Sequence, residues 1–410
     1  MNKNILLLLA AALLSMQAQA QIKYQKFYDR NSQVAVEGMM NDDSVRIGDW
    51  TWWHPNGRVY QQGRYNSKGE KTGIWKVYYE DGSRCAEECY SNNGFTRTWF
   101  QNGDLQSEVE VSNGKKNGTY KSWFNNGQQK DEINFVNGSR EGATKEWHEN
   151  GKLKFEGTYK NNELEGLATW WTANGNLDMK GRLKNGEKEG EWLYYWRTTG
   201  KLGIKGTYTN GNENGTWTYY YETGEKWREG KYVNGYREGT WTTWYEKGQK
   251  LHEGPYQKGK ENGVWTAYYE SGKTDYTGNF RNGMKNGKWE AYYDDNRPRY
   301  VIYYLDDEKN GEETRYFPNG KVEIRCHWKD GTYNGLYERF NSAGKPEEMG
   351  NFVDGEKEGK WVFFDDYGNE MIVAKFQNGK MLSMEDKSKN PNNAPKAPAN
   401  NNKPTQKKKR

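Results

Sequence analysis

The segment GTWTYYYETGEKWREGKYVNGYRE, residues 215–238, is followed at Gly239 by a second segment that begins GTWTTWYEKG. The two segments are successive copies of one unit. Aligning the whole chain on Gly-x-Trp gives fourteen unit starts, mostly 24 residues apart: Gly48, Gly73, Gly94, Gly118, Gly142, Gly166, Gly190, Gly215, Gly239, Gly263, Gly287, Gly311, Gly335 and Gly359. Self-similarity at a fixed period predicts a tandem-repeat protein in which each unit packs on its neighbours.

Each unit carries two turn signals, counted here from its first glycine as position zero. One falls at positions eight and nine, as in Asn56-Gly57, and predicts a type I′ hairpin because Asn-Gly tolerates positive φ angles. The other falls near position twenty, as in Asn137-Gly138, and predicts a four-residue loop to the next hairpin. The predicted fold is therefore all-β: an elongated antiparallel sheet or solenoid of about 14 tandem β-hairpin repeats of 24 residues.

The two loops also predict the strand register. A two-residue first turn pairs residues whose positions sum to seventeen, so Trp217 faces Gly230, and Trp241 faces Gly254 in the next unit. A large ring beside a strand glycine compensates for the weakness of glycine in sheets. A four-residue second loop pairs position seventeen with position two of the following unit, as in Tyr232 with Trp241, and extends the sheet.

The chain also predicts four consecutive regions. Residues 1–20 resemble a secretory signal peptide, with an apolar run from Ile5 to Leu14 and a small-residue cleavage site ending at Ala20. Residues 21–47 form an N-terminal cap, and residues 48–380 hold the repeats. Residues 381–410, rich in Asn, Pro and Lys, form a disordered basic tail. We therefore expect an exported protein of the periplasm or outer envelope.

Charge and residue content limit the chemistry. The tail carries a net charge of +6, whereas the whole chain carries +5, so the remaining residues carry about −1. The repeats are therefore not basic, and no nucleic-acid partner is expected. Cys85 and Cys89 lie about 13 Å apart along one extended strand, too far for a disulfide, and Cys326 is ten repeats away. His54 and His148 fall at position six, where tyrosine is usual. We expect no metal, no cofactor and no enzymatic activity.

The unit Gly-x-Trp-x-x-Tyr-Tyr-x-x-Gly, at Gly215–Gly224 and Gly263–Gly272, resembles the bacterial variant of the membrane occupation and recognition nexus (MORN) repeat. The resemblance covers about residues 46–380. It implies stacked hairpins that serve in interactions, with membrane or lipid association for some members. Bacterial proteins with this variant are often labelled antitoxins, which leaves an antitoxin or immunity function as one alternative.

An aromatic residue stands at position five of every repeat, and strand alternation puts it on the face opposite the Trp–Gly pairs. Rings about 10 Å apart would suit a sugar polymer or a repetitive partner. The alternative is that bulges break the alternation and that these rings belong to the core. Ten of them form the candidate partner-binding ladder: Trp53, Trp99, Trp123, Trp147, Trp171, Tyr195, Tyr220, Trp244, Tyr268 and Tyr292.

These observations favour a protein-binding scaffold in the cell envelope. The partner would be another envelope protein. A second hypothesis is direct binding of peptidoglycan, another polysaccharide or anionic lipid through the ladder and the basic tail. Both ends of a long open sheet present an unpaired strand, so a homodimer is a further expectation.

Overall fold

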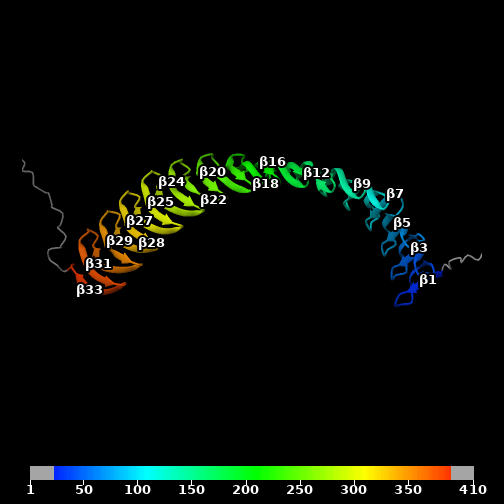
Figure 1. The fold of residues 1–410 in the computed structure, drawn as a ribbon, viewed down its shortest axis with the longest axis horizontal. Helices are drawn as coiled ribbons and strands as arrows, with labels where there is room; N and C mark the ends of the chain where they lie inside the picture. The colour runs from blue at the N-terminus through cyan, green and yellow to red at the C-terminus, as the bar shows by residue number, and fades with distance from the viewer. Residues whose placement is uncertain (1–22, 389–410) are drawn as a thin grey trace, which may run out of the picture. The chain divides into compact units, whose positions relative to one another are not determined.

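The computed structural model describes residues 23–388; the signal peptide predicted at residues 1–20 and the chain from residue 389 onward lie outside this range. The described residues form strands and turns and contain no helix. They divide into two compact units, which meet after Asn212 in the sequence. Within each unit, antiparallel hairpins follow one another in chain order (Figure 1), which confirms the predicted all-β repeat fold.

The first unit contains the strands from β1 to β17. Its strands are β1 (Lys23–Tyr28), β2 (Val34–Met40), β3 (Arg46–Trp53), β4 (Val59–Tyr65), β5 (Lys71–Tyr78), β6 (Arg84–Cys89), β7 (Asn93–Trp99), β8 (Leu105–Ser112), β9 (Lys115–Trp123), β10 (Gln129–Val136), β11 (Ser139–Trp147), β12 (Leu153–Lys160), β13 (Glu163–Leu164), β14 (Gly166–Trp171), β15 (Leu177–Lys184), β16 (Glu187–Tyr195) and β17 (Leu202–Thr209).

The second unit begins within the next strand and continues in the same pattern. Its strands are β18 (Asn212–Tyr220), β19 (Lys226–Val233), β20 (Tyr236–Trp244), β21 (Lys250–Gln257), β22 (Lys260–Glu261), β23 (Gly263–Tyr268), β24 (Thr274–Arg281), β25 (Met284–Tyr292), β26 (Pro298–Leu305), β27 (Glu308–Tyr316), β28 (Val322–Lys329), β29 (Thr332–Phe340), β30 (Pro346–Val353), β31 (Glu356–Phe364), β32 (Glu370–Gln377) and β33 (Lys380–Asp386).

The repeat pattern extends further at both ends than the sequence predicts. The segment predicted as a cap contains the β1–β2 hairpin, in which Gln25 faces Gly38 in the register of the Trp–Gly pairs. At the other end, the predicted tail boundary at Met381 is too early, because β33 continues to Asp386 and pairs with β32. In this pairing Met384 lies opposite Ala374, which is only 2% exposed.

The first turn of the repeat differs from the predicted type I′ turn. The backbone N–H of His54 donates to Arg58 O at 2.8 Å, and the N–H of Gly57 donates to His54 O at 2.9 Å. Gly57, with φ +83°, is the loop residue in the left-handed region, which defines a type I turn followed by a glycine bulge. A compensating register shift between Trp52 and Trp53 follows. Beyond it, facing residues again have repeat positions that sum to seventeen, as predicted.

That compensation preserves the predicted Trp–Gly pairs. Trp217 faces Gly230, Trp241 faces Gly254, Trp265 faces Gly278, and in the first unit Trp192 faces Gly206. From the first glycine to position four, the register inside the hairpins was therefore correct, although the turn type and the partner of position five were wrong.

In most repeats the connection between hairpins is a two-residue type I′ turn, not the predicted four-residue loop; the β4–β5 connection is longer, because Tyr65 pairs with Lys71. Asn137 and Gly138 both have positive φ, +49° and +90°, and Val136 pairs with Ser139. A bulge near the first glycine of the next repeat follows. Position two therefore faces position fifteen of the preceding repeat, not position seventeen, as Trp289 faces Gly278.

The aromatic contacts predicted between neighbouring repeats nevertheless form, diagonally across the strands. The rings of Tyr232 and Trp241 meet edge to face with centroids 5.1 Å apart, and those of Tyr256 and Trp265 do so at 5.2 Å. Such pairs add to the stability that ring burial provides.

Each consensus Trp lies flat over the glycine of the preceding repeat. A Cβ on Gly254 would lie 2.2 Å from Cδ2 of Trp265, so only glycine leaves room for the ring. The indole N–H of Trp265 donates to Pro255 O at 3.1 Å. The rings are 0–6% exposed although the sheet is a single layer. We call this side the indole face; its rings are Trp50, Trp75, Trp192, Trp217, Trp241, Trp265, Trp289 and Trp361.

Some repeats replace the Trp and the glycine together. Ile133 faces Thr144, so a larger residue at position fifteen accompanies a smaller one at position two of the next repeat. Ile302 faces Glu313 in the same way. The volume of the pair, more than either residue alone, determines what fits on the indole face.

Candidate binding face

The ten predicted ladder residues all lie at the end of the first strand of a hairpin, and all are half-buried. Strand alternation places them on the side opposite the indole rings, which we call the ladder face. Six belong to the first unit and four to the second. The rings are thus accessible in part, unlike the buried consensus tryptophans.

The backbone of the ladder is held by the residue at position six of the preceding repeat. The hydroxyl of Tyr245 donates to Tyr268 O at 2.9 Å, and that of Tyr269 donates to Tyr292 O at 2.8 Å. In the first unit, Nε2 of His148 donates to Trp171 O at 2.8 Å. His148 therefore takes the structural role of a tyrosine, as its position in the repeat predicts.

In the first unit, four of the six ladder rings face leucines, which the periodicity alone did not single out, whereas Trp53 faces Val59 and Trp123 faces Gln129. The pairs are Trp99 with Leu105, Trp147 with Leu153, Trp171 with Leu177, and Tyr195 with Leu202. The leucines are half-buried, like the rings. Ion pairs between strands run beside this stripe: Arg97–Glu108 at 3.2 Å, Lys145–Glu156 at 3.4 Å and Lys121–Glu132 at 4.0 Å. The result is an apolar stripe with a charged border.

In the second unit, the ladder rings stand beside polar clusters instead. Glu229 accepts hydrogen bonds from Thr218 at 2.9 Å and from Lys226 at 2.9 Å, and the Lys226 ammonium lies 5.6 Å from the Trp244 ring centroid. The next repeat has the same arrangement. There Glu253 accepts bonds from Lys250 at 2.8 Å, Thr242 at 3.4 Å and the Tyr268 hydroxyl at 3.1 Å.

These contacts fix the charges of the two clusters at neutral pH. The hydrogen bond from Lys250 is the main cause that lowers the pKa of Glu253. Burial raises the pKa of Glu229, but hydrogen bonds from Lys226 and Thr218 outweigh it, so the net shift is also downward. Both carboxylates are therefore ionised acceptors, held in place beside an aromatic ring.

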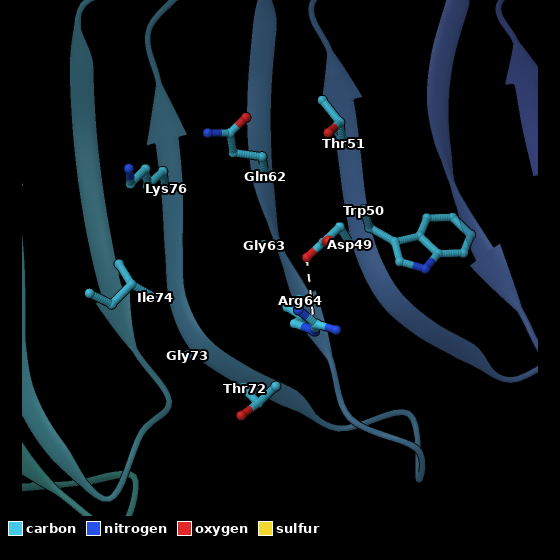
Figure 2. A pocket seen from close by; sticks show the side chains of 10 residues that line it. All are labelled: Asp49, Trp50, Thr51, Gln62, Gly63, Arg64, Thr72, Gly73, Ile74 and Lys76. Atoms are coloured by element: carbon cyan, nitrogen blue, oxygen red, sulfur yellow. Dashed lines mark ion pairs between the residues drawn. The ribbon is translucent and has the colours of Figure 1, made fainter. Parts of the chain in front are cut away.

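An open depression on the ladder face lies near the start of the first unit. Figure 2 shows Asp49 and Arg64, joined by an ion pair at 4.0 Å, with the Trp50 indole directed away from them. Gly63 and Gly73 contribute no side chain, which leaves the hollow. Its lining residues are Asp49, Trp50, Thr51, Gln62, Gly63, Arg64, Thr72, Gly73, Ile74 and Lys76.

A second depression surrounds a ladder ring. Tyr292 lines it together with Asn296 and three hydroxyl side chains, Thr266, Thr274 and Thr277. A third includes small polar residues at position four, Thr98 and Ser122, where other repeats have aromatic rings. The repeats that begin at Gly94 and Gly118 have Thr96 and Tyr120 at position two in place of the consensus Trp, and this departure was the sequence signal for the hollow.

The described residues offer little for other chemistry. Residues 23–388 contain no group of three or more His, Cys, Asp or Glu side chains suited to a metal ion. In the same range no helix is long and apolar enough to span a membrane. Cys85, Cys89 and Cys326 are free thiols, so disulfides do not staple the repeats.

Together, the repeated hairpins, the indole face with its buried tryptophans and the open ladder face define a tandem β-hairpin repeat protein. The family model described as "MORN repeat variant" matches residues 46–67, 71–92, 140–161, 213–234, 237–258, 261–282 and 309–330. Each match begins two residues before the first glycine of a repeat. The chain is a MORN-repeat protein, and such repeats are typical of scaffold or binding proteins that are generally non-catalytic.

Other comparisons add little. No curated protein matches the chain. Among solved structures, the TcdB2–TccC3–Cdc42 complex matches at 11% identity and a TM-score of 0.16, covering 88% of this chain and 22% of that chain. The Tc holotoxin pore of Photorhabdus luminescens matches at 12% identity and a TM-score of 0.16, with the same coverages of 88% and 22%. The chain thus spans about a fifth of the length of these chains, and TM-scores this low do not bear on its fold.

Proposed function

We propose that this chain is an exported, non-enzymatic scaffold that binds another protein of the cell envelope through its ladder face. One observation carries the proposal: the half-buried Trp–Leu stripe of the first unit, which no second layer covers among residues 23–388. The indole face buries its own rings, which leaves the ladder face for a partner. Export is inferred from the apolar segment at residues 5–14.

The Trp–Leu stripe gives the first testable prediction. Trp147→Ala combined with Trp171→Ala removes two neighbouring aromatic anchors, and such anchors dominate protein interfaces. We expect at least about a tenfold lower recovery of one recurrent protein partner, because losing two anchors costs about 2 kcal/mol or more. The measurement is cross-linking in living cells, followed by mass spectrometry of what stays attached to the purified chain.

Trp196→Ala is the matched control for this experiment. Trp196 is 39% exposed and belongs to the same unit, but position six places it on the indole face. The control variant should recover the partner at the wild-type level. Equal recovery with the double ladder variant, or recovery of no protein at all, would contradict the scaffold proposal.

A second candidate function is binding of an envelope glycan by the second unit. The observation that favours it is the repeated cluster of a ring, a carboxylate, a lysine and a threonine, at Trp244 with Glu229 and at Tyr268 with Glu253. Aromatic faces beside fixed hydrogen-bond acceptors suit sugar rings and their hydroxyls.

The two functions differ in how binding is lost. With isolated peptidoglycan as the probe, successive replacement of Trp244, Tyr268 and Tyr292 by alanine should weaken glycan binding step by step. A protein partner would instead be lost at one local patch. Binding to anionic vesicles that disappears on deletion of residues 389–410 would point to lipid instead.

A further inference from the structure

The last strand of the described chain, β33, has one open edge. Its other edge pairs with β32, where Ala374 faces Met384 and Gln377 faces Lys380. No strand among residues 23–388 pairs with the open edge. Unpaired N–H and C=O groups along such an edge form a ready template for another strand.

The side chains of β33 differ from those of a protected edge. All seven residues of the strand are exposed, including Met381 at 55%, Leu382 at 56% and Met384 at 58%. The register puts Met384 in the place of a consensus Trp, over Ala374. Met384 is thus exposed at a position that is buried in the consensus repeats, and exposed apolar side chains grouped on one strand mark an interaction surface.

The sequence of β33 is complementary to itself. When two copies pair antiparallel about Ser383, all seven residues are matched, Lys380 faces Asp386 twice, and Leu382 faces Met384 twice. Opposite charges and apolar pairs directly across two strands stabilise a sheet. By contrast β1, KYQKFY, carries two lysines and no acidic residue, so two copies of that edge could form no opposite-charge pair across the junction.

We propose that β33 is a dimerisation strand, and that its partner is β33 of a second copy of this chain, related by a two-fold axis perpendicular to the sheet. With this axis, each residue faces one whose number differs from its own by an even amount, as Leu382 faces Met384. Side chains from the same face of the two strands therefore lie on the same side of the joined sheet. The ladder faces next to the junction consequently lie on one side. Such a dimer binds a repetitive partner with two faces at once.

The junction is small. Two seven-residue strands bury less than the roughly 1,600 Å² of a standard protein interface, so we expect a weak, reversible dimer. Sedimentation velocity of the full mature chain over a concentration series measures this directly. We expect a monomer–dimer equilibrium for the wild type.

Charge reversal tests the proposed register. Lys380→Glu places two like charges opposite Asp386 in the dimer and should raise its dissociation constant about tenfold or more. Asp386→Lys alone should do the same. The double variant Lys380→Glu/Asp386→Lys should dimerise like the wild type, and an equimolar mixture of the two single variants should form heterodimers, because each then supplies the charge that the other lacks.

Glu385→Lys is the matched control, since residue 385 faces Met381 in this register and its replacement should leave the dissociation constant within about twofold. A wild-type chain that stays monomeric at all concentrations overturns the proposal. So does a double variant that fails to recover. A chain that dimerises only after deletion of residues 389–410 would show that the native occupant of this edge is the chain's own C-terminal segment, and would equally overturn it.

Discussion

Gly254→Ile is expected to open the hairpins formed by residues 239–288. A Cβ at this position would lie 2.2 Å from Cδ2 of Trp265, and the hydrogen bond from the indole N–H to Pro255 O at 3.1 Å opposes movement of the ring. Overpacking of this kind costs about 3 kcal/mol. Hydrogen exchange of peptides from residues 239–288, measured by mass spectrometry, reports the local loss of stability, since repeat proteins open in parts.

A second substitution should rescue the first. Trp265→Thr alone leaves a cavity and costs about 3 to 5 kcal/mol. Together, Gly254→Ile and Trp265→Thr recreate the pair that the chain already uses at Ile133 and Thr144. We expect the double variant to be at least about 2 kcal/mol more stable than the sum of the single effects predicts. Additive losses would show that volume compensation does not govern the indole face.

The repeat period and the Trp–Gly register were predictable because both follow from the spacing of residues along the sequence. The turn types were not, because Asn-Gly suits a type I′ turn and also the end of a type I turn with a glycine bulge. A clue to the bulge between hairpins was present in the sequence. Gly142 adopts φ +90° without belonging to a tight turn, and an isolated strand glycine often marks a bulge.

The same error hid the character of the ladder. With a type I′ turn, Trp147 would face Lys154; with the observed turn it faces Leu153. A shift of one residue exchanges a polar neighbour for an apolar one. The aromatic residues of the ladder were therefore predictable from periodicity, whereas the division into a Trp–Leu stripe and a set of polar clusters required the register.

Glu313→Gln should produce a local loss of stability where the repeat departs most from its consensus. Glu313 stands in the place of a Trp and is 1% exposed. Its carboxylate accepts hydrogen bonds from Lys309 Nζ and from the Trp328 indole, both at 2.7 Å, and also from Arg315. The neutral amide leaves the two cations without their counter-charge. Because Lys309 and Arg315 are partly solvated, the expected cost is about 2 kcal/mol.

The carboxylate also makes this repeat sensitive to acid. Burial by itself raises the pKa of Glu313, but hydrogen bonds from Lys309 and Arg315 outweigh it and the net pKa is lowered from 4.5. The unfolded state therefore binds the proton more readily. The stability contributed by Glu313 is fully present above about pH 4.5 and is lost as the pH falls below it. Hydrogen exchange of residues 308–329 at pH values above and below this point measures the loss.

Two variants separate the buried carboxylate from general acid effects. Glu312→Gln changes a neighbouring side chain that is 69% exposed, and it should alter stability by less than about 0.5 kcal/mol and keep the acid transition. Glu313→Trp combined with Ile302→Gly restores the consensus pair, because the glycine makes room for the ring. This variant should fold and lose the acid transition of residues 308–329. If the transition persists there, or in Glu313→Gln, its cause lies in another group and the role assigned to Glu313 is wrong.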